Sequence, residues 1–150
     1  MTSFMVPTSA PLLDHAGVEA ARLVRAGREG LVSGHPSVTY ALLADARGQR
    51  EASVRQWVRR LRLAGRLCTV DWGGVTLIPS FQFDEAYEPV AEVADVVERL
   101  TRSGMSGWAT WRWFAVTNPW VDERPAALVA AGDFGRLGAA ADALLADSGE

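Results

Sequence analysis

WATWRWFAVTNPWVDERPAAL, residues 108–128, carries four of the six tryptophans of the chain and two corners marked by proline. Pro119 disfavours the α conformation at Asn118, because its ring clashes with the backbone of the preceding residue. A helix predicted over residues 110–116 should therefore end near Asn118. The stretch predicts an aromatic helix that stops abruptly in a rigid loop.

A second short helix is predicted after this loop, over residues 126–131. Pro125 suits its first turn, where the missing N–H of proline costs nothing. Asp122 or Glu123 is the candidate N-cap. Gly132 then ends the helix, so the aromatic stretch is expected to form a helix, a loop and a helix.

Family resemblance adds a function to this pattern. The motif WxWFxxxNPWVDERPAAL, followed by the small-residue segment GRLGAAADALLA, resembles the C-terminal toxin-binding domain of Xre/MbcA/ParS-type antitoxins. LIPSFQFD, residues 77–84, resembles the link that often precedes this domain. The resemblance covers about the last half of the chain. Asp122 and Glu123 depart from it, since the family usually has glycine there.

The resemblance implies an antitoxin of a type II toxin-antitoxin pair. Its partner would be a RES-domain toxin that consumes NAD, and the C-terminal half would cover the active cleft of that toxin. We expect Trp113 and Leu128 to be buried, and Trp120 and Arg124 to be exposed interface anchors. The residues that the resemblance assigns to toxin binding are Trp113, Asn118, Pro119, Trp120, Arg124, Pro125 and Leu128.

Composition excludes several other classes of protein. Half of the 150 residues are apolar and 22% are charged, which is typical of a globular rather than a disordered chain. No apolar run approaches the length of a membrane span, so we expect a cytoplasmic protein. Cys68 lies in an apolar run that favours a buried inert thiol. His15 and His35 lack metal-site spacing, and no catalytic constellation emerges, so neither an enzyme nor a cofactor is predicted.

Charge divides the chain into two parts of opposite sign. All fifteen basic residues are arginine, and residues 47–66 hold seven of them with one acid, a local net charge of +6. Residues 84–150 hold twelve acids and five arginines, a net charge of −7. The basic part suits a polyanion and the acidic part would be repelled by one, so the two parts should have different partners.

The basic part has the length and order of a helix-turn-helix. A first helix is predicted from Asp14 to about residue 25, ended by Gly27 and Gly30. A short helix capped by Ser37 follows, and Gly48 closes it. The predicted inner residues of this short helix are Val38, Ala41, Leu42 and Ala44.

The next helix, EASVRQWVRRLRLAG, residues 51–65, is the predicted DNA-reading element. Its apolar residues recur at helical spacing and leave a basic outer face. Arginines near phosphates release counterions, and polar side chains near the start of the helix suit base edges. The alternative is a solvated arginine face without a partner. The candidate DNA-binding residues are Arg50, Ser53, Arg55, Gln56, Arg59 and Arg62.

A β-hairpin is predicted next, with Gly73-Gly74 as its turn, because glycine readily supplies the positive φ values that such turns need. A hairpin after a recognition helix would form a small wing. Trp72 could touch a DNA backbone or simply cover the hairpin. The hairpin and the helices before it make residues 14–79 a DNA-binding region, after a loosely packed tail of residues 1–13.

The remaining chain is predicted to be helical. Residues 80–89 form an aromatic linker, and residues 90–150 form a helical module with an inner stripe at Val90, Val93, Val97 and Leu100. The fold class is therefore mainly α, with an N-terminal helix-turn-helix, one hairpin and a C-terminal helical toxin-binding module.

Two alternatives to the antitoxin hypothesis remain open. One is a stand-alone helix-turn-helix regulator whose C-terminal half only dimerises. The other is an adaptor whose arginines do not meet DNA. The antitoxin hypothesis predicts operator DNA, a cognate toxin and a homodimer within a larger complex as partners.

Overall fold

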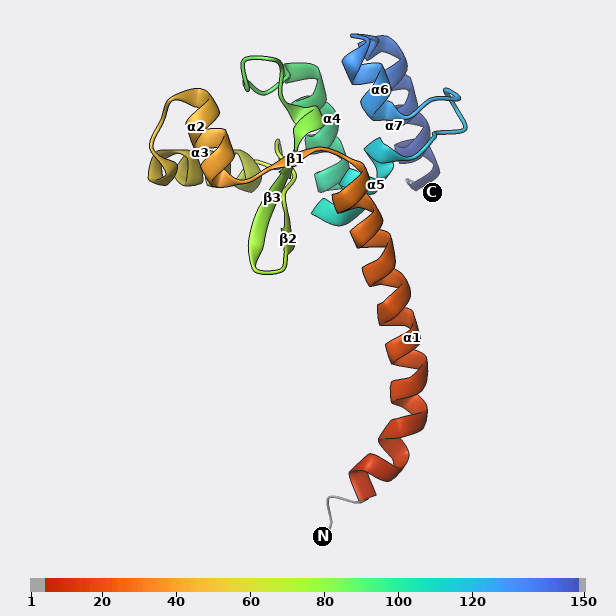
Figure 1. Ribbon diagram of the computed structural model, residues 1–150. Coiled ribbons are helices and arrows are strands. Elements are labelled where there is room, and N and C mark those ends of the chain that lie inside the picture. Colours follow the sequence, from red (N-terminus) through yellow and green to blue (C-terminus); the bar gives the residue numbers. More distant parts are fainter. Residues whose placement is uncertain (1–4, 149–150) are drawn as a thin grey trace. The chain divides into compact units, whose positions relative to one another are not determined.

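The computed structural model describes the backbone of residues 5–148 and the side chains of residues 15–147. The chain forms two compact units, Met1–Gly34 and His35–Glu150. The first unit contains one helix, α1 (Met5–Gly34), and the second contains all the other elements (Figure 1). Within the described residues, no helix is long and apolar enough to cross a membrane.

Helix α1 differs from the sequence prediction at both ends. Asp14 lies inside the helix rather than at its N-cap, and the backbone stays helical through Gly27 and Gly30. A helical glycine costs only about 1 kcal/mol relative to alanine, so good helix formers on both sides carry the helix through it. The predicted loose tail lies partly outside the described residues, which begin at Met5.

Helices α2 (Tyr40–Arg47) and α3 (Glu51–Leu63) form the predicted helix-turn-helix pair. The cap of α2 is Thr39, whose hydroxyl accepts a hydrogen bond from the Leu42 N–H at 3.2 Å. The predicted cap Ser37 was wrong because the chain is still extended there. Gly48 closes α2 in the left-handed conformation with φ 65°, as expected.

The inner face of α2 is also shifted from its prediction. Leu43 and Ala44 are the buried residues of the helix. Ala41 and Leu42 are exposed, because starting the helix at Tyr40 rotates them toward solvent. Val38 is buried as predicted, but in a strand rather than in the helix.

The predicted hairpin is present and belongs to a sheet of three strands. Strands β2 (Val70–Trp72) and β3 (Val75–Pro79) pair antiparallel, with Trp72 opposite Val75. Gly73 and Gly74 form the turn with φ 59° and 80°, two positive values in a two-residue turn. Strand β1 (Ser37–Val38), which the sequence did not reveal, pairs with the buried C-terminal end of β3. The strand order is β1-β3-β2.

The C-terminal module is helical, as predicted. The 3₁₀ turn η2 (Ser80–Gln82) leads from the sheet toward it. Its helices are α4 (Ala91–Arg102), α5 (Gly107–Ala115), α6 (Pro125–Ala130) and α7 (Phe134–Ser148). Pro125 occupies the first turn of α6, but Arg124 rather than an acidic residue is its N-cap and makes no side-chain capping bond. The described fold is thus mainly helical with one small antiparallel sheet.

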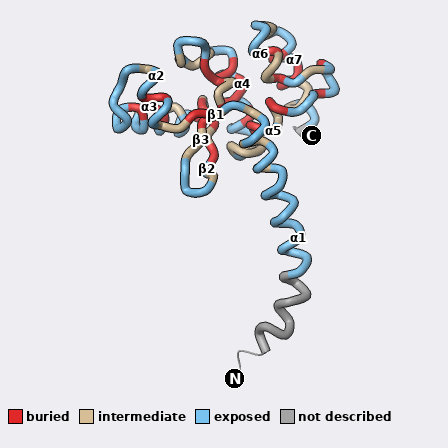
Figure 2. The backbone as a smooth tube through the Cα atoms, in the orientation of Figure 1, coloured by how far each residue is buried: buried red, intermediate tan, exposed pale blue. Residues whose placement is uncertain are grey.

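Two apolar clusters lie on either side of the linker, and the aromatic linker residues reach both. Phe81 stacks on Phe114 of α5, with ring centroids 4.1 Å apart, in the C-terminal cluster. Phe83 lies 6.3 Å from Trp57 of α3, in the helix-turn-helix cluster. The buried backbone follows the inner sides of the helices in both regions (Figure 2). The linker therefore belongs to both cores within the unit His35–Glu150.

Candidate nucleic-acid interface

Helix α3 has one buried face and one exposed face. Val54 and Val58 are fully buried, and Trp57 and Leu61 pack beside them. The opposite side follows from helical geometry, which places residues spaced by three or four on the same face. The outermost line of side chains consists of Ala52, Gln56, Arg59 and Leu63, all exposed.

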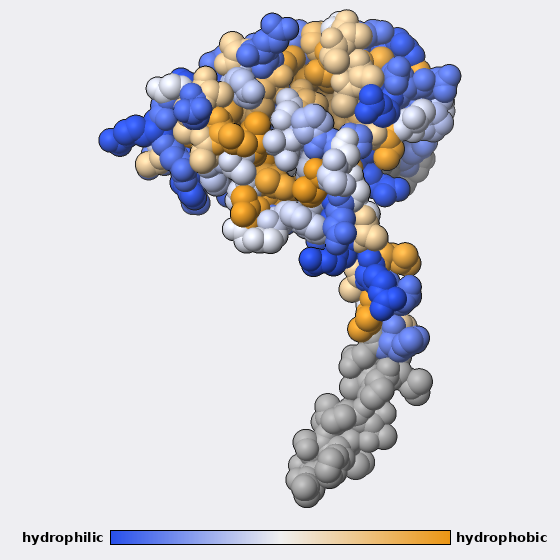
Figure 3. All heavy atoms as spheres, viewed as in Figure 1, coloured by the Kyte–Doolittle hydropathy of each residue, from blue (hydrophilic) through white to orange (hydrophobic). Residues whose placement is uncertain are grey.

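The predicted DNA-binding residues all lie on the exposed surface of this segment. Arg55 and Arg62 flank the outermost line on one side, and Ser53 and Arg60 flank it on the other. In Figure 3, strongly hydrophilic side chains project at the outer edge of the part that α2 and α3 form, beside less polar ones. The six predicted residues, each exposed, are Arg50, Ser53, Arg55, Gln56, Arg59 and Arg62.

Arg47, the first arginine of the basic segment, is held inside the fold. Its guanidinium lies over the Trp57 ring, 3.9 Å from the centroid. The same side chain donates to the Tyr87 carbonyl at 2.7 Å and to Glu88 at 2.9 Å. Its side chain is only 11% exposed, so Arg47 joins α2 to the linker rather than facing a ligand.

Arg66, the last arginine of the segment, is also used internally. It donates to Asp95 at 2.9 Å and to Glu98 at 2.8 Å, both on α4. Hydrogen bonds from its side chain to Asp95 and then Glu98 raise the pKa of Arg66 above its ordinary value. Arg66 therefore ties the end of the helix-turn-helix to the C-terminal module.

The arginines between these two are much less constrained. Arg55 pairs with Glu51, one turn earlier, at 2.7 Å and lies 4.7 Å from the centroid of the Tyr40 ring. Across the side chains that the structure describes, residues 15–147, no ion pair is seen for four other arginines of this surface. Those arginines are Arg50, Arg59, Arg60 and Arg62. They leave a positive surface that is not neutralised within the fold.

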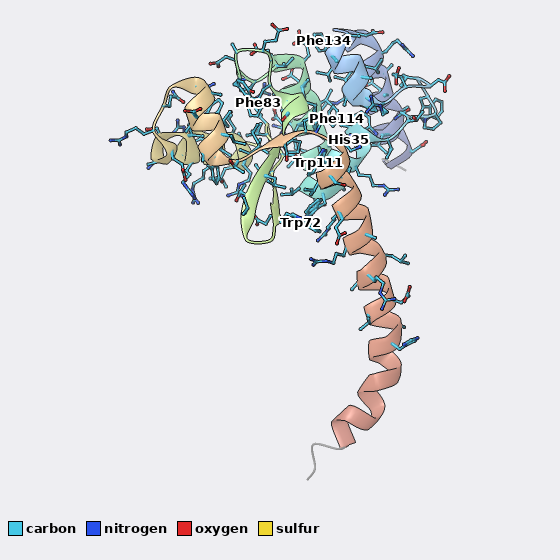
Figure 4. The ribbon with its side chains drawn as sticks, in the orientation of Figure 1. His35, Trp72, Phe83, Trp111, Phe114 and Phe134 are labelled. Atoms are coloured by element: carbon cyan, nitrogen blue, oxygen red, sulfur yellow. The ribbon has the colours of Figure 1, made fainter. Side chains whose placement is uncertain are left out.

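The hairpin beside α3 contributes no positive charge. Its one ionisable side chain, Asp71, accepts a hydrogen bond from the Thr76 hydroxyl at 3.1 Å. Trp72 meets Trp108 edge to face at 5.7 Å, which supports its covering role over a contact with DNA (Figure 4). The hairpin lies where a wing would lie, but it carries no basic side chain that could contact a phosphate backbone.

Two residues that sequence reasoning missed position this wing. The buried amide of Gln82 makes paired hydrogen bonds with the backbone of Cys68, just before β2. Gly107, at the start of α5, comes so close to the Thr69 carbonyl that an added Cβ would lie 2.1 Å from that oxygen. Gln82 lies within LIPSFQFD and Gly107 in no motif, but neither role could be assigned from sequence, because both depend on contacts that only the fold creates.

The loop between α5 and α6 is organised by Asn118. Its side-chain oxygen accepts from the Trp120 N–H at 2.8 Å, and its backbone carbonyl accepts from the Asp122 N–H at 2.8 Å. Asp122 has φ 54°, a left-handed conformation that aspartate tolerates better than most residues. The acidic residue therefore takes the backbone shape that a glycine would. Arg136 of α7 donates to the Val121 carbonyl and holds the loop from the other side.

The seven residues assigned to toxin binding differ in how far they are buried. Leu128 is 2% exposed and Trp120 is 66% exposed, both as predicted. Arg124 is exposed as predicted, whereas Trp113 is only half-buried, against the edge of Phe114. The remaining members are the buried Asn118 and Pro125 and the exposed Pro119.

Comparison with known proteins identifies a shared fold. The chain is similar to the NMR structure of Rv2175c from M. tuberculosis, with a TM-score of 0.62 and 20% sequence identity. The match covers 73% of this chain and 81% of that chain. No protein-family model matches the sequence, and no curated protein matches it. At this identity the likeness is one of backbone architecture.

Proposed function

We propose that this chain is a DNA-binding transcription regulator that places α3 in the major groove. A helix of this kind, preceded by a shorter helix and followed by a hairpin, is the arrangement used by many DNA readers. The likeness to Rv2175c supports a fold of the kind found in DNA-binding proteins. The acidic C-terminal module would then face away from the DNA.

One observation carries this proposal. The arginines at the two ends of the basic segment, Arg47 and Arg66, have partners inside the fold. Arg59 and Arg62 lie on the exposed side of α3, and the exposed Arg50 is its N-cap residue. Arg59 and Arg62 leave positive charge that is not neutralised by the described side chains on the exposed side of α3, and such charge is what phosphate contacts require.

The proposal assigns different roles along α3. Arg59 and Arg62, in the second half of the helix, would contact phosphates. Ser53 and Gln56, near its start, would face base edges, where glutamine suits adenine. Phosphate contacts set affinity and register, and base contacts set sequence preference.

The test is DNA binding measured by fluorescence anisotropy over a range of salt concentrations, with a short duplex of mixed sequence. Arg59→Ala with Arg62→Ala should weaken binding roughly tenfold or more and lower the salt slope by about two. The matched control, Arg102→Ala with Arg112→Ala, removes the same charge from α4 and α5. Equal losses in both variants would reduce the effect to net charge and overturn the role of α3.

The antitoxin hypothesis is a second candidate, favoured by the exposure of Trp120. Its side chain is 66% exposed on a loop that Asn118 and Arg136 hold in place. Rigid exposed tryptophans are common anchors of protein interfaces. The proposed partner is a RES-domain enzyme that consumes NAD, and in this case the DNA-binding helix would repress the operon of the pair.

Neutralisation of the toxin tests this candidate independently of DNA. Trp120→Ala should release NAD consumption in cells that express both proteins, while the fold and DNA binding stay intact. Val75→Ala, which trims an exposed apolar residue on the wing, is the control. A folded Trp120→Ala variant that still protects cells would remove Trp120 from the interface. Failure to bind any RES-domain enzyme would leave the stand-alone regulator.

A further inference from the structure

A wide groove crosses the C-terminal module, away from both surfaces described above. It has a volume of about 980 Å³ and lies between the linker, the start of α4, and helices α6 and α7. Its floor is apolar and aromatic. The linker contributes Phe83 and α7 contributes Phe134 (Figure 4). The main apolar lining residues are Phe81, Phe83, Val90, Ala126, Val129 and Phe134.

The rim of the groove is acidic. Asp84, Glu85 and Glu92 line it and are exposed, and none of the described lining residues is basic. Asp84 accepts hydrogen bonds from the N–H groups of Ala86 and Glu88, so it also fixes the shape of the rim. For Glu85 and Glu92, the described part of the chain supplies no ion-pair partner.

The charge of this rim decides what can bind. The first turn of α4 begins in the groove without a side-chain cap, and a helix N-terminus carries about half a positive charge. Three carboxylates outweigh it, so the local potential is negative and a nucleic acid or other polyanion is repelled. The uncapped N–H groups can donate hydrogen bonds to a backbone carbonyl oxygen of a polypeptide, which is a neutral partner.

We propose that this groove binds a basic amphipathic segment of a partner protein. Apolar side chains of the segment would fill the floor between Phe81 and Phe134. Flanking lysine or arginine side chains would lie along the rim and reach Glu85 and Glu92 while remaining partly in water. An amphipathic helix that inserts its apolar face in such a groove is a common mode of peptide recognition.

The groove is separate from the DNA-binding and toxin-binding proposals. It shares no residue with the exposed face of α3, and it does not include Trp120. Binding there would leave α3 accessible, so one chain could hold DNA and a protein at the same time. The proposal therefore stands or falls without either of the other two.

The test titrates the full chain, labelled with ¹⁵N, with an amphipathic helical peptide of leucine and lysine. We expect saturable shifts of the amide signals of Ala86, Ala126 and Ala130, and no such shifts with the matching peptide of leucine and glutamate. Glu85→Lys with Glu92→Lys should weaken binding about tenfold. The control Asp45→Lys with Asp147→Lys makes the same change in charge outside the groove and should have little effect.

A second variant probes the α6 side of the groove rather than its acidic rim. Ala130→Gln adds a longer neutral side chain to the exposed end of α6 and should weaken the peptide severalfold, with circular dichroism confirming an unchanged fold. Equal weakening by the Asp45/Asp147 control overturns the proposal. Displacement of the peptide by tetraphenylphosphonium would assign the groove to small lipophilic cations instead. Shifts at Ala126 and Ala130 that depend on chain concentration alone would assign it to a second copy.

Discussion

The side chain of Gln82 pairs with the backbone of Cys68 as a neighbouring strand would. Its Oε1 accepts from the Cys68 N–H at 2.7 Å, and its Nε2 donates to the Cys68 carbonyl at 2.9 Å. A further bond from Nε2 to the Pro79 carbonyl is 3.1 Å long. All these groups are buried, so they need hydrogen-bond partners. The one amide of Gln82 supplies them for the backbone of Cys68, between α3 and the wing, and so fixes the wing relative to the linker.

Replacing the Gln82 amide should lower the free energy of unfolding more than most point mutations do. Gln82→Leu keeps the approximate size but leaves the N–H and carbonyl of Cys68 unpaired in the interior. We expect the free energy of unfolding to fall by roughly 3 kcal/mol, since each buried unpaired group costs about 1–3 kcal/mol. Urea denaturation measures this loss. Gln56→Leu, on the exposed face of α3, is the control and should change stability by less than about 0.5 kcal/mol.

Gly107 is a second position at which a substitution should destabilise the fold. In Gly107→Ala the new methyl group would lie 2.1 Å from the Thr69 carbonyl oxygen, so the backbone of α5 or of the segment before β2 must move. Overpacking of this kind costs roughly 1–3 kcal/mol. Thermal unfolding should show a clear loss in Gly107→Ala. Gly138→Ala in α7, where an added Cβ meets nothing within 4 Å, should be neutral or stabilising; equal effects would contradict the close approach.

A substitution at Glu51 tests the DNA-binding surface by an expected gain of DNA affinity, whereas the arginine variants test it by a loss. It is the one acid of α3 and pairs with Arg55 at 2.7 Å. Glu51→Gln frees that arginine and removes a repulsive charge, so DNA affinity should rise about threefold at low salt and the salt slope should steepen by up to about one. Asp45→Asn, on α2, is a charge-matched control. An unchanged affinity would place the start of α3 away from the phosphates.

The hairpin and α3 could be predicted from sequence because local patterns determine them. Two glycines between alternating residues admit few structures other than a tight turn, and the spacing of Val54, Val58 and their neighbours defines one face of a helix. The aromatic stretch was predictable for the same reason. Pro119 and Pro125 restrict the backbone wherever they occur, which placed the end of α5 and the start of α6 within a residue or two.

Features that depend on distant contacts could not be predicted. Strand β1 has two residues, and it exists only because β3 offers a free edge to Ser37 and Val38. Arg47 and Arg66 resemble their exposed neighbours in sequence, yet their partners lie 29 to 41 positions away in the linker and α4. Counting all seven arginines as one basic surface therefore overstated the charge available to DNA.

Replacing Trp111 with alanine should lower the stability of the fold far more than replacing Trp120. Trp111 is 1% exposed and Trp120 is 66% exposed, although both belong to the aromatic stretch. Trp111→Ala should lower the free energy of unfolding by roughly 3–5 kcal/mol, because it opens a large cavity. Trp120→Ala should change it by less than about 0.5 kcal/mol. Chemical denaturation of both variants decides whether the exposed tryptophan is retained for the fold, in which case Trp120→Ala would also be destabilised.

The buried thiol of Cys68 should make the free energy of unfolding fall as the pH rises into the alkaline range. Burial raises its pKa from 9.0 to about 12, so the folded state holds this proton more tightly than the unfolded state. The resulting stabilisation is complete below pH 9.0 and is lost as the pH rises toward about 12, because only the unfolded chain then releases the proton. Unfolding free energies measured on both sides of pH 9 should therefore fall more steeply for the native chain than for Cys68→Ala. The native thiol should also react slowly with a disulfide reagent at neutral pH until denaturant is added. Identical pH slopes for the two proteins, together with rapid labelling, would mean that solvent reaches Cys68 and that the path from α3 to the wing opens readily.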